Sequence, residues 1–223
     1  IQTLKQLENE NRTATFEEQK VLSKYVGWGG LSQVFDSSNE RWNKEYNELK
    51  SLLTKEEYEA ARATVNNAFY TAPEIALAIN QALVQFGLRR GNILEPSMGI
   101  GNFFGNMLQE LSESNLYGVE IDSLSGRIAK QLYPNAMIQI TGFEKTNYPD
   151  NFFDAVIGNV PFGDYKVNDV RYNQYNFRIH DYFIAKSLDQ VRPGGMVAVV
   201  TSCGTLDKKN PMIRKYIAKR AEL

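Results

Sequence analysis

The chain has 223 residues, enough for one substantial domain, alone or with a helical extension. Its 25 Lys and Arg side chains are balanced by 26 Asp and Glu side chains, which excludes a global basic surface that holds nucleic acid through phosphates alone. The single cysteine excludes an internal disulfide, and no apolar run reads as a signal peptide or membrane span. We therefore expect a cytoplasmic protein that makes no contact with a membrane.

The first third of the chain is predicted to be helical. Three Thr/Glu pairs with the spacing of a capping box predict helix starts: Thr15 with Glu18, Thr54 with Glu57, and Thr71 with Glu74. Pro73 supports the third start, because proline is favoured in the first helical turn. The glycines in the letters YVGWGG, residues 25–30, are expected to end the first helix with Trp28 packed inward. A loop over a bound cofactor is the alternative for this stretch.

From residue 91 onward, short apolar runs alternate with helical stretches. This pattern predicts an α/β fold with a doubly wound, mostly parallel sheet. The expected strands cover residues 92–95, 115–120, 136–140, 154–158 and 195–202, and the expected helices lie near 102–111, 123–132, 181–190 and 209–221. The letters VRPGG, residues 191–195, predict a sharp turn before the last strand.

A glycine turn follows the first expected strand in the letters NILEPSMGIGNFFGNM. Gly99 and Gly101 allow a ligand to approach the backbone closely, and the helix that follows offers free N–H groups. The third glycine, Gly105, stands one position late for a dinucleotide fingerprint. Glu95 and Pro96 end the strand, and a carboxylate there suits a positively charged ligand better than a pyrophosphate.

The second expected strand ends in the letters GVEID. Glu120 stands about 20 residues after the glycines, where a doubly wound fold places the carboxylate that accepts two ribose hydroxyls. Asp122 is the alternative ribose ligand, and a solvated acid at a strand end is the structural alternative.

The fourth expected strand ends in Asn159, followed by Val160, Pro161 and Phe162. An amide oxygen and the carbonyl of Val160 can accept the two hydrogens of an exocyclic amino group, while the ring of Phe162 stacks on a flat molecule. Stacking of a base on an aromatic side chain contributes about 1–3 kcal/mol. These residues therefore predict a platform for a nucleobase.

Together these motifs resemble the adenine-specific DNA methyltransferases that use S-adenosylmethionine. EPSMGIGNFF resembles the cofactor loop of that family, GVEID its ribose strand, NVPF its Asn-Pro-Pro-Tyr/Phe catalytic motif, and FYTAPEIA the segment that closes over the methionine end of the cofactor. The wording of the whole further resembles the methylase region of large mobile-element proteins that also carry a helicase. The resemblance implies a Rossmann-like methyltransferase fold, a bacterial cytoplasm, and a helicase domain in the same parent protein.

The resemblance also implies the site residues and S-adenosyl-L-methionine as the cofactor. The predicted cofactor residues are Thr71, Glu95, Pro96, Gly99, Gly101, Glu120, Phe143 and Phe183, and the predicted catalytic residues are Asn159, Val160, Pro161 and Phe162. Phe143 is assigned because Gly142, Phe143 and Glu144 stand where the family has an acidic residue for the cofactor's adenine. Val160 replaces the first proline of the catalytic motif but keeps the carbonyl that the family uses.

The implied reaction is methylation of the N6 amino group of adenine in DNA, which requires no metal ion and no strong general base. Two alternatives stay open: methylation of a glutamine side-chain amide in a protein, and a methylase fold kept as a scaffold or DNA-docking module. We expect an N-terminal helical segment over residues 1–68 and a methyltransferase domain over residues 69–223, ending before the last strands of the family fold. DNA would then be held largely by segments outside this chain.

Overall fold

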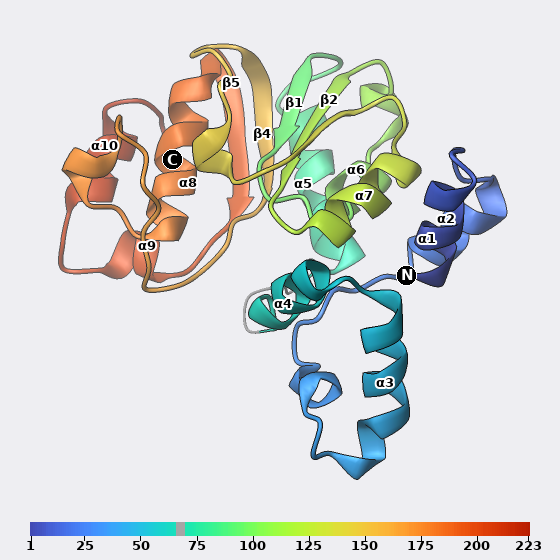
Figure 1. Cartoon of the computed structure of the whole chain (residues 1–223). Coiled ribbons are helices and arrows are strands. Elements are labelled where there is room, and N and C mark those ends of the chain that lie inside the picture. The colour runs from blue at the N-terminus through green and yellow to red at the C-terminus, as the bar shows by residue number, and fades with distance from the viewer. Residues whose placement is uncertain (66–69) are drawn as a thin grey trace.

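A parallel sheet of five strands forms the centre of the molecule. The structure, a computed structural model, describes every residue except 66–69. The strands are β1 (Asn92–Glu95), β2 (Asn115–Glu120), β3 (Met137–Ile140), β4 (Phe153–Asn159) and β5 (Val191–Val200). Their order in the sheet is β3-β2-β1-β4-β5, so the chain moves outward from β1 in one direction and then returns to its other side (Figure 1). The doubly wound α/β prediction is confirmed, and the direction reverses between β1 and β4.

Helices cover both faces of the sheet. They are α5 (Pro73–Gln85), α6 (Asn102–Gly105), α7 (Ser123–Leu132), α8 (Ile179–Gln190), α9 (Gly204–Asp207) and α10 (Met212–Ala218). Successive residues of β1 point to opposite faces: Ile93 packs in one cluster with Leu83 of α5, and Leu94 packs in another with Tyr182 of α8. Both residues are fully buried because both faces are covered, which explains the continuous apolar runs.

Four further helices precede the sheet. They are α1 (Gln2–Asn9), α2 (Phe16–Leu22), α3 (Asn43–Leu52) and α4 (Lys55–Ala63). The capping boxes at Thr15 and Thr54 are confirmed, whereas α1 and α3 were not predicted.

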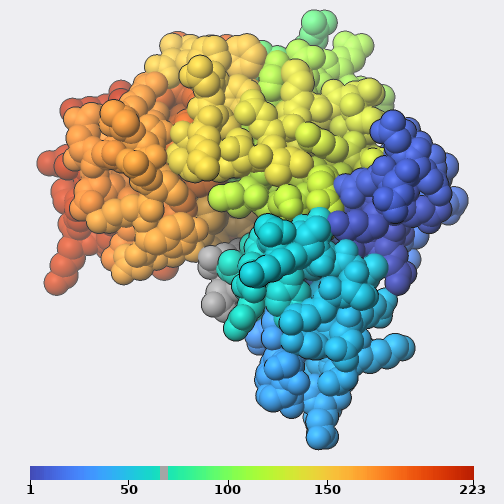
Figure 2. Space-filling model, in the orientation of Figure 1, coloured from blue at the N-terminus to red at the C-terminus, as the bar shows by residue number. Residues whose placement is uncertain are grey.

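The N-terminal helices share a core with α7. Leu4, Leu22 and Leu49 pack in one cluster with Leu124 and Ile128 of α7. Figure 2 shows these helices, coloured blue to cyan, lying against the green and yellow part of the molecule. The expected domain boundary between residues 68 and 69 lies outside the described residues, so the division into two domains stays a prediction.

Two predictions about helix ends are wrong. Thr71 does not cap α5: the N-cap is Ala72, no side chain caps it, and Pro73 occupies the first turn, so Glu74 stands too early for a capping box. The glycines of YVGWGG do not end α2, because that helix already stops at Leu22. Gly27 and Gly30 instead have φ of 69° and 75°, which glycine adopts without strain and which bends this loop sharply.

Three predicted elements have different bounds. The expected helix 102–111 is the short α6 followed by a 3₁₀ turn over Gln109–Leu111, and the expected helix 209–221 is the shorter α10, which has Pro211 at its N-cap. Strand β5 already begins at Val191, and the letters VRPGG form an irregular bulge in it rather than a separate turn. The bulge arises because Pro193 has no N–H for the ladder and Gly194 has φ of 75°. No helix in the described part of the chain has both the length and the apolarity to cross a membrane.

Candidate cofactor and target site

A cavity of about 260 Å³ opens at the carboxyl ends of the strands, beside the point where the strand order reverses. Of the predicted cofactor residues it is lined by Thr71, Glu95, Pro96, Gly99, Glu120, Phe143 and Phe183, and of the predicted catalytic residues by Asn159, Val160, Pro161 and Phe162. The tertiary structure therefore brings together residues that span more than half of the chain.

Gly101 is the predicted cofactor residue that lies behind this surface. It begins α6 with φ of 88°, and a Cβ atom there would lie 2.5 Å from the ring of Tyr133. Its carbonyl accepts a hydrogen bond from the Tyr133 hydroxyl at 2.7 Å. Gly101 thus shapes the turn from the side opposite the cavity.

Glu95 is a buried carboxyl group with unused bonding capacity. Its side chain accepts a hydrogen bond from the backbone N–H of Phe103 in α6, and its Oε2 atom has no hydrogen-bond partner. Burial, and next the charge of Glu120, raise the pKa of Glu95 well above its ordinary value. A cation that reached Oε2 of Glu95 would therefore meet an oxygen that accepts no other hydrogen bond.

Glu120 ends β2 and is held by the backbone. Its Oε2 accepts from the N–H of Gly99 at 2.7 Å, and its Oε1 accepts from the N–H of Asp122 at 2.7 Å. Burial raises its pKa to about 7, although these hydrogen bonds oppose the rise. The first bond ties the glycine turn after β1 to the end of β2 and so fixes the floor of the cavity.

Asp122, the alternative ribose ligand, already has a structural role. It is the N-cap of α7, and its Oδ2 accepts from the N–H of Ser125 at 2.9 Å. Between the two acids stands Ile121, which lines the cavity although 72% of its side chain is exposed. Sequence reasoning did not identify it, and an apolar residue directly after the acid that ends β2 is the signal that was available.

The opposite wall of the cavity is aromatic. Phe143 and Phe183 are both buried, and their ring centroids lie 5.0 Å apart. Phe143 comes from the short turn after β3 and Phe183 from α8, so this wall joins two separate connections of the sheet.

The end of β4 explains why a valine stands in the catalytic motif. The N–H of Val160 donates to the carbonyl of Val200 at 3.1 Å and so extends the β4–β5 ladder, and its side chain is only 1% exposed in the core. A proline could make neither the hydrogen bond nor the same packing. Just before it, the carbonyl of Asn159 accepts from the Ser97 hydroxyl at 2.9 Å, which ties β4 to the glycine turn.

Two aromatic side chains follow at the mouth of the cavity. Phe162 is 38% exposed and Tyr165 is 44% exposed, and both line the cavity. The ring of Phe162 is therefore turned toward the site rather than into the core. Sequence reasoning did not identify Tyr165, which no spacing rule marks.

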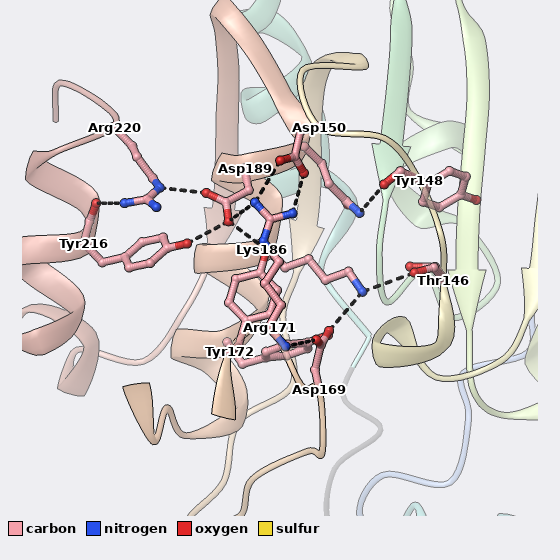
Figure 3. A network of polar contacts seen from close by, with 12 residues as sticks. Thr146, Tyr148, Asp150, Asp169, Arg171, Tyr172, Lys186, Asp189, Tyr216 and Arg220 are labelled. Carbon is pink, nitrogen blue, oxygen red and sulfur yellow. Dashed lines mark hydrogen bonds and ion pairs between the residues drawn. The ribbon is translucent and has the colours of Figure 1, made fainter. Parts of the chain in front are cut away.

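A buried lysine, Lys186, joins the segment after β4 (residues 160–178), which carries these aromatic residues, to the turn after β3 (Figure 3). Lys186 of α8 donates to the carbonyl of Phe143 at 2.8 Å and pairs with Asp169 at 3.4 Å. Asp169 also accepts from the Tyr182 hydroxyl at 2.8 Å. Desolvation lowers the pKa of Lys186, and Asp169 opposes that shift.

A second buried carboxylate, Asp189, fixes the same segment to the C-terminal helix (Figure 3). It accepts from the hydroxyl groups of Tyr172 and Tyr216 at 2.8 and 2.7 Å, and from Arg220 at 2.7 Å. Its charge is thus balanced by hydrogen bonds from both the segment after β4 and α10, which holds the segment in one conformation.

The remaining reactive side chains lie apart from the cavity. Cys203 is exposed just after β5, and His180 is buried near the start of α8 without lining the cavity. Within the part of the chain that the structure describes, no group of three or more His, Cys, Asp or Glu side chains is arranged to hold a metal ion.

The doubly wound sheet, with its cavity at the reversal of strand order, defines the Rossmann-like fold of S-adenosylmethionine-dependent methyltransferases. Two solved structures share this fold. A type I restriction-modification methyltransferase subunit from Streptococcus thermophilus has a TM-score of 0.58 and 16% identity, covering 83% of this chain and 49% of that chain. A modification subunit of a putative type I restriction enzyme from Vibrio vulnificus YJ016 has a TM-score of 0.53 and 18% identity, covering 81% of this chain and 43% of that chain.

The chain belongs to the N-6 DNA methylase family, which it matches over residues 52–223. It is 33% identical over 159 residues to the Defense against restriction protein B of Escherichia phage P1, covering 69% of this chain and 7% of that protein. It is 34% identical over 94 residues to the Type II methyltransferase M.CvrRI of Paramecium bursaria Chlorella virus XZ-6E, covering 42% of this chain and 24% of that enzyme. The chain therefore spans a minor part of both relatives.

Proposed function

We propose that this chain is the catalytic domain of a longer protein and transfers a methyl group from S-adenosylmethionine to the N6 amino group of adenine in DNA. One observation carries the proposal: the motif Asn159 to Phe162 and the buried carboxyl group of Glu95 line the same cavity. Membership of the N-6 DNA methylase family supports adenine in DNA over a protein amide as the target.

The donor set fits the cofactor. Glu95 offers an unpartnered buried carboxyl oxygen for the ammonium group of the methionine end. Glu120 has acceptor capacity left for ribose hydroxyls, because a carboxylate has about four lone-pair sites and this one accepts from the backbone N–H groups of Gly99, Asp122 and Ile121. Ile121, Phe143 and Phe183 supply apolar surface for an adenine ring.

The cofactor, when bound, supplies a methyl group that is already activated by its sulfonium. The task of the protein is then to make an aromatic amine nucleophilic, since its lone pair is delocalised into the ring. Acceptance of the two N6 hydrogens by the Asn159 side chain and the Val160 carbonyl localises that lone pair and opposes the positive charge that develops. Phe162 holds the base in plane by stacking, and the proton lost from N6 passes to water.

The longer protein would supply the rest of the DNA-binding surface. This chain has a formal net charge of −1, so it cannot hold a duplex through a general excess of positive charge. Segments outside the chain would bind DNA, and a helicase domain in the same parent protein stays a prediction.

The test is a nucleoside analysis of DNA treated with the full-length parent protein and S-adenosylmethionine. We expect N6-methyladenine to accumulate with the wild type and to fall at least a hundredfold with Asn159→Ala, since loss of one preorganised polar contact costs about 10²–10³ in rate. Equal amounts from both proteins would exclude Asn159 from the reaction. Label in protein and none in DNA would favour the glutamine alternative instead.

A further inference from the structure

The loop in the letters YVGWGG reaches the cavity from the N-terminal segment. Gly27 and Trp28 line the cavity together with Glu95 and Gly99, although more than 60 residues of sequence separate the two pairs. Trp28 is at the same time 8% exposed, so the prediction that it packs inward is confirmed. The functional role of this loop is not explained by the sheet or by the catalytic motif.

Tyr70 connects the loop to the glycine turn. A Cβ atom on Gly27 would lie 2.4 Å from Cε2 of the Tyr70 ring, and a Cβ atom on Gly99 would lie 2.9 Å from Cε1. Real Cβ atoms do not approach other atoms so closely, so both glycines leave the space that this ring fills. The ring of Tyr70 is thus wedged between the N-terminal loop on one edge and the predicted cofactor turn on the other.

The position of Tyr70 is fixed in two further ways. Its hydroxyl lies 3.0 Å from Oγ of Ser125, which donates in turn to the N-cap Asp122. Its ring meets Tyr25 edge-on at 6.3 Å, and Tyr25 meets Trp28 at 6.0 Å. The same edge-on contacts continue from Trp28 into the core of the N-terminal helices. A shift of the loop would therefore move Tyr70 and, with it, the wall of the cavity.

We propose that Gly27 and Trp28 belong to the cofactor site, where they hold Tyr70 against Gly99. They thereby set the shape of the part of the cavity that receives the methionine end of the cofactor. The affinity for S-adenosylmethionine then depends on the N-terminal helical segment as well as on the sheet. The inference rests on the proposed function, because it assumes that this cavity takes the cofactor.

The decisive experiment compares Gly27→Ala with Gly30→Ala by calorimetry with S-adenosylmethionine. Both glycines have positive φ, 69° and 75°, so the backbone strain introduced by alanine is similar. A methyl group on Gly30 meets nothing within 4 Å, whereas one on Gly27 displaces Tyr70. We expect at least a tenfold weaker affinity for Gly27→Ala and less than a twofold change for Gly30→Ala, with thermal unfolding showing that both variants are folded.

A second measurement does not require Gly27→Ala to fold. The experiment uses the 223-residue chain by itself, in which the tryptophans are Trp28 and Trp42, so the tryptophan emission of its Trp42→Phe variant comes from Trp28 alone. Titration with S-adenosylmethionine should change that emission, and the dissociation constant from the titration curve should equal the one measured by calorimetry. An emission that stays constant while calorimetry detects binding would overturn the inference, as would equal affinities of the two alanine variants. Absence of binding by the wild type would overturn the proposed function itself and this inference with it.

Discussion

Glu95 and Glu120 end the adjacent parallel strands β1 and β2, both are buried, and the charge of Glu120 adds to the effect of burial on the pKa of Glu95. Two buried carboxyl groups that interact electrostatically destabilise the free protein once both ionise. Such a pair is expected where a protein binds a positively charged ligand. It also makes the stability of the free protein depend on pH.

The stability of the wild type relative to Glu95→Gln should fall as the pH rises from 5 to 8. The pKa of Glu95 lies well above its ordinary value of 4.5 in the native state, so the native protein retains a proton that the unfolded chain has released. The free energy of unfolding therefore decreases with pH in this window. Urea unfolding at four pH values measures it. His180, whose pKa is lowered by burial, acts in the opposite direction but equally in both proteins, so the difference reports on Glu95 together with its electrostatic coupling to Glu120, whose pKa burial raises to about 7.

The same substitution should separate stability from cofactor binding. Glu95→Gln keeps an oxygen for the N–H of Phe103 but removes the negative charge, so we expect at least a tenfold weaker affinity for S-adenosylmethionine, about 1.4 kcal/mol. Calorimetry at pH 8 measures the affinity. A variant that is more stable than the wild type at pH 8 and binds equally well would contradict the assignment of Glu95 to the cofactor.

Introduction of the family's proline at position 160 should destabilise this protein. Val160→Pro removes the N–H that bonds to Val200 and the buried valine packing, so we expect a loss of about 3 kcal/mol in the free energy of unfolding. The matched control is Val160→Ala, which keeps the N–H and the carbonyl and should lose about 1–2 kcal/mol through a cavity while methylation persists. Unfolding curves and a methylation assay measure both effects. Full stability of the proline variant would show that the ladder does not extend to Val160.

Loss of the Phe162 ring should lower the activity on DNA more than the stability of the fold. Because 38% of the residue is exposed, Phe162→Ala should change the free energy of unfolding by less than about 1.5 kcal/mol. Loss of stacking should lower kcat/KM on DNA by about 1–3 kcal/mol, roughly 5- to 150-fold. Phe162→Tyr retains a flat ring and should keep most of the activity. Equal activity of the alanine and tyrosine variants would exclude stacking by this residue.

Removal of the buried ammonium group of Lys186 should lower both the stability of the fold and the affinity for the cofactor. Lys186→Met leaves the carbonyl of Phe143 and the carboxylate of Asp169 without their cation, and we expect a loss of about 3 kcal/mol in the free energy of unfolding. The affinity for S-adenosylmethionine should fall as well, because Phe143 lines the cavity. The control is Lys145→Met, which removes a positive charge from an exposed position in the turn that contains Phe143. It should leave both the stability and the affinity unchanged. An affinity unaffected by Lys186→Met at a temperature where it is folded would contradict this coupling.

Local sequence patterns predicted many of the helices and strands, because these elements depend mainly on residues that are neighbours in the chain. The apolar runs fixed four of the strands to within one residue at each end, and two capping boxes marked the starts of α2 and α4 correctly. The third capping box failed at Thr71 because Pro73 sets the first turn without help from a side chain. The last helix is shorter than predicted, Met212–Ala218 rather than 209–221, because Pro211 stands at its N-cap and the helix ends at Ala218.

Most of the predicted site residues lie in short contiguous motifs, and these motifs line one cavity in the structure, while their roles stay predictions. The glycine turn, the acid that ends β2 and the motif at the end of β4 are each contiguous in the chain, and their place at one edge follows from parallel strand order. Sequence reasoning did not identify Tyr70, Tyr165 or Lys186 as site residues, because their relevant neighbours are distant in the chain and no spacing encodes such contacts.

The sequence by itself thus determined the class of fold and the approximate bounds of most strands, and it placed the candidate residues at three strand ends, because these depend on periodicity and on neighbouring residues. Tertiary structure alone decided that the N–H of Val160 belongs to the ladder and that Lys186 joins the turn that contains Phe143 to Asp169 in the segment after β4. It also decided that Tyr70 is wedged between Gly27 and Gly99. The physical reason is that packing and buried hydrogen bonds join residues by distance in space, which a linear pattern does not record.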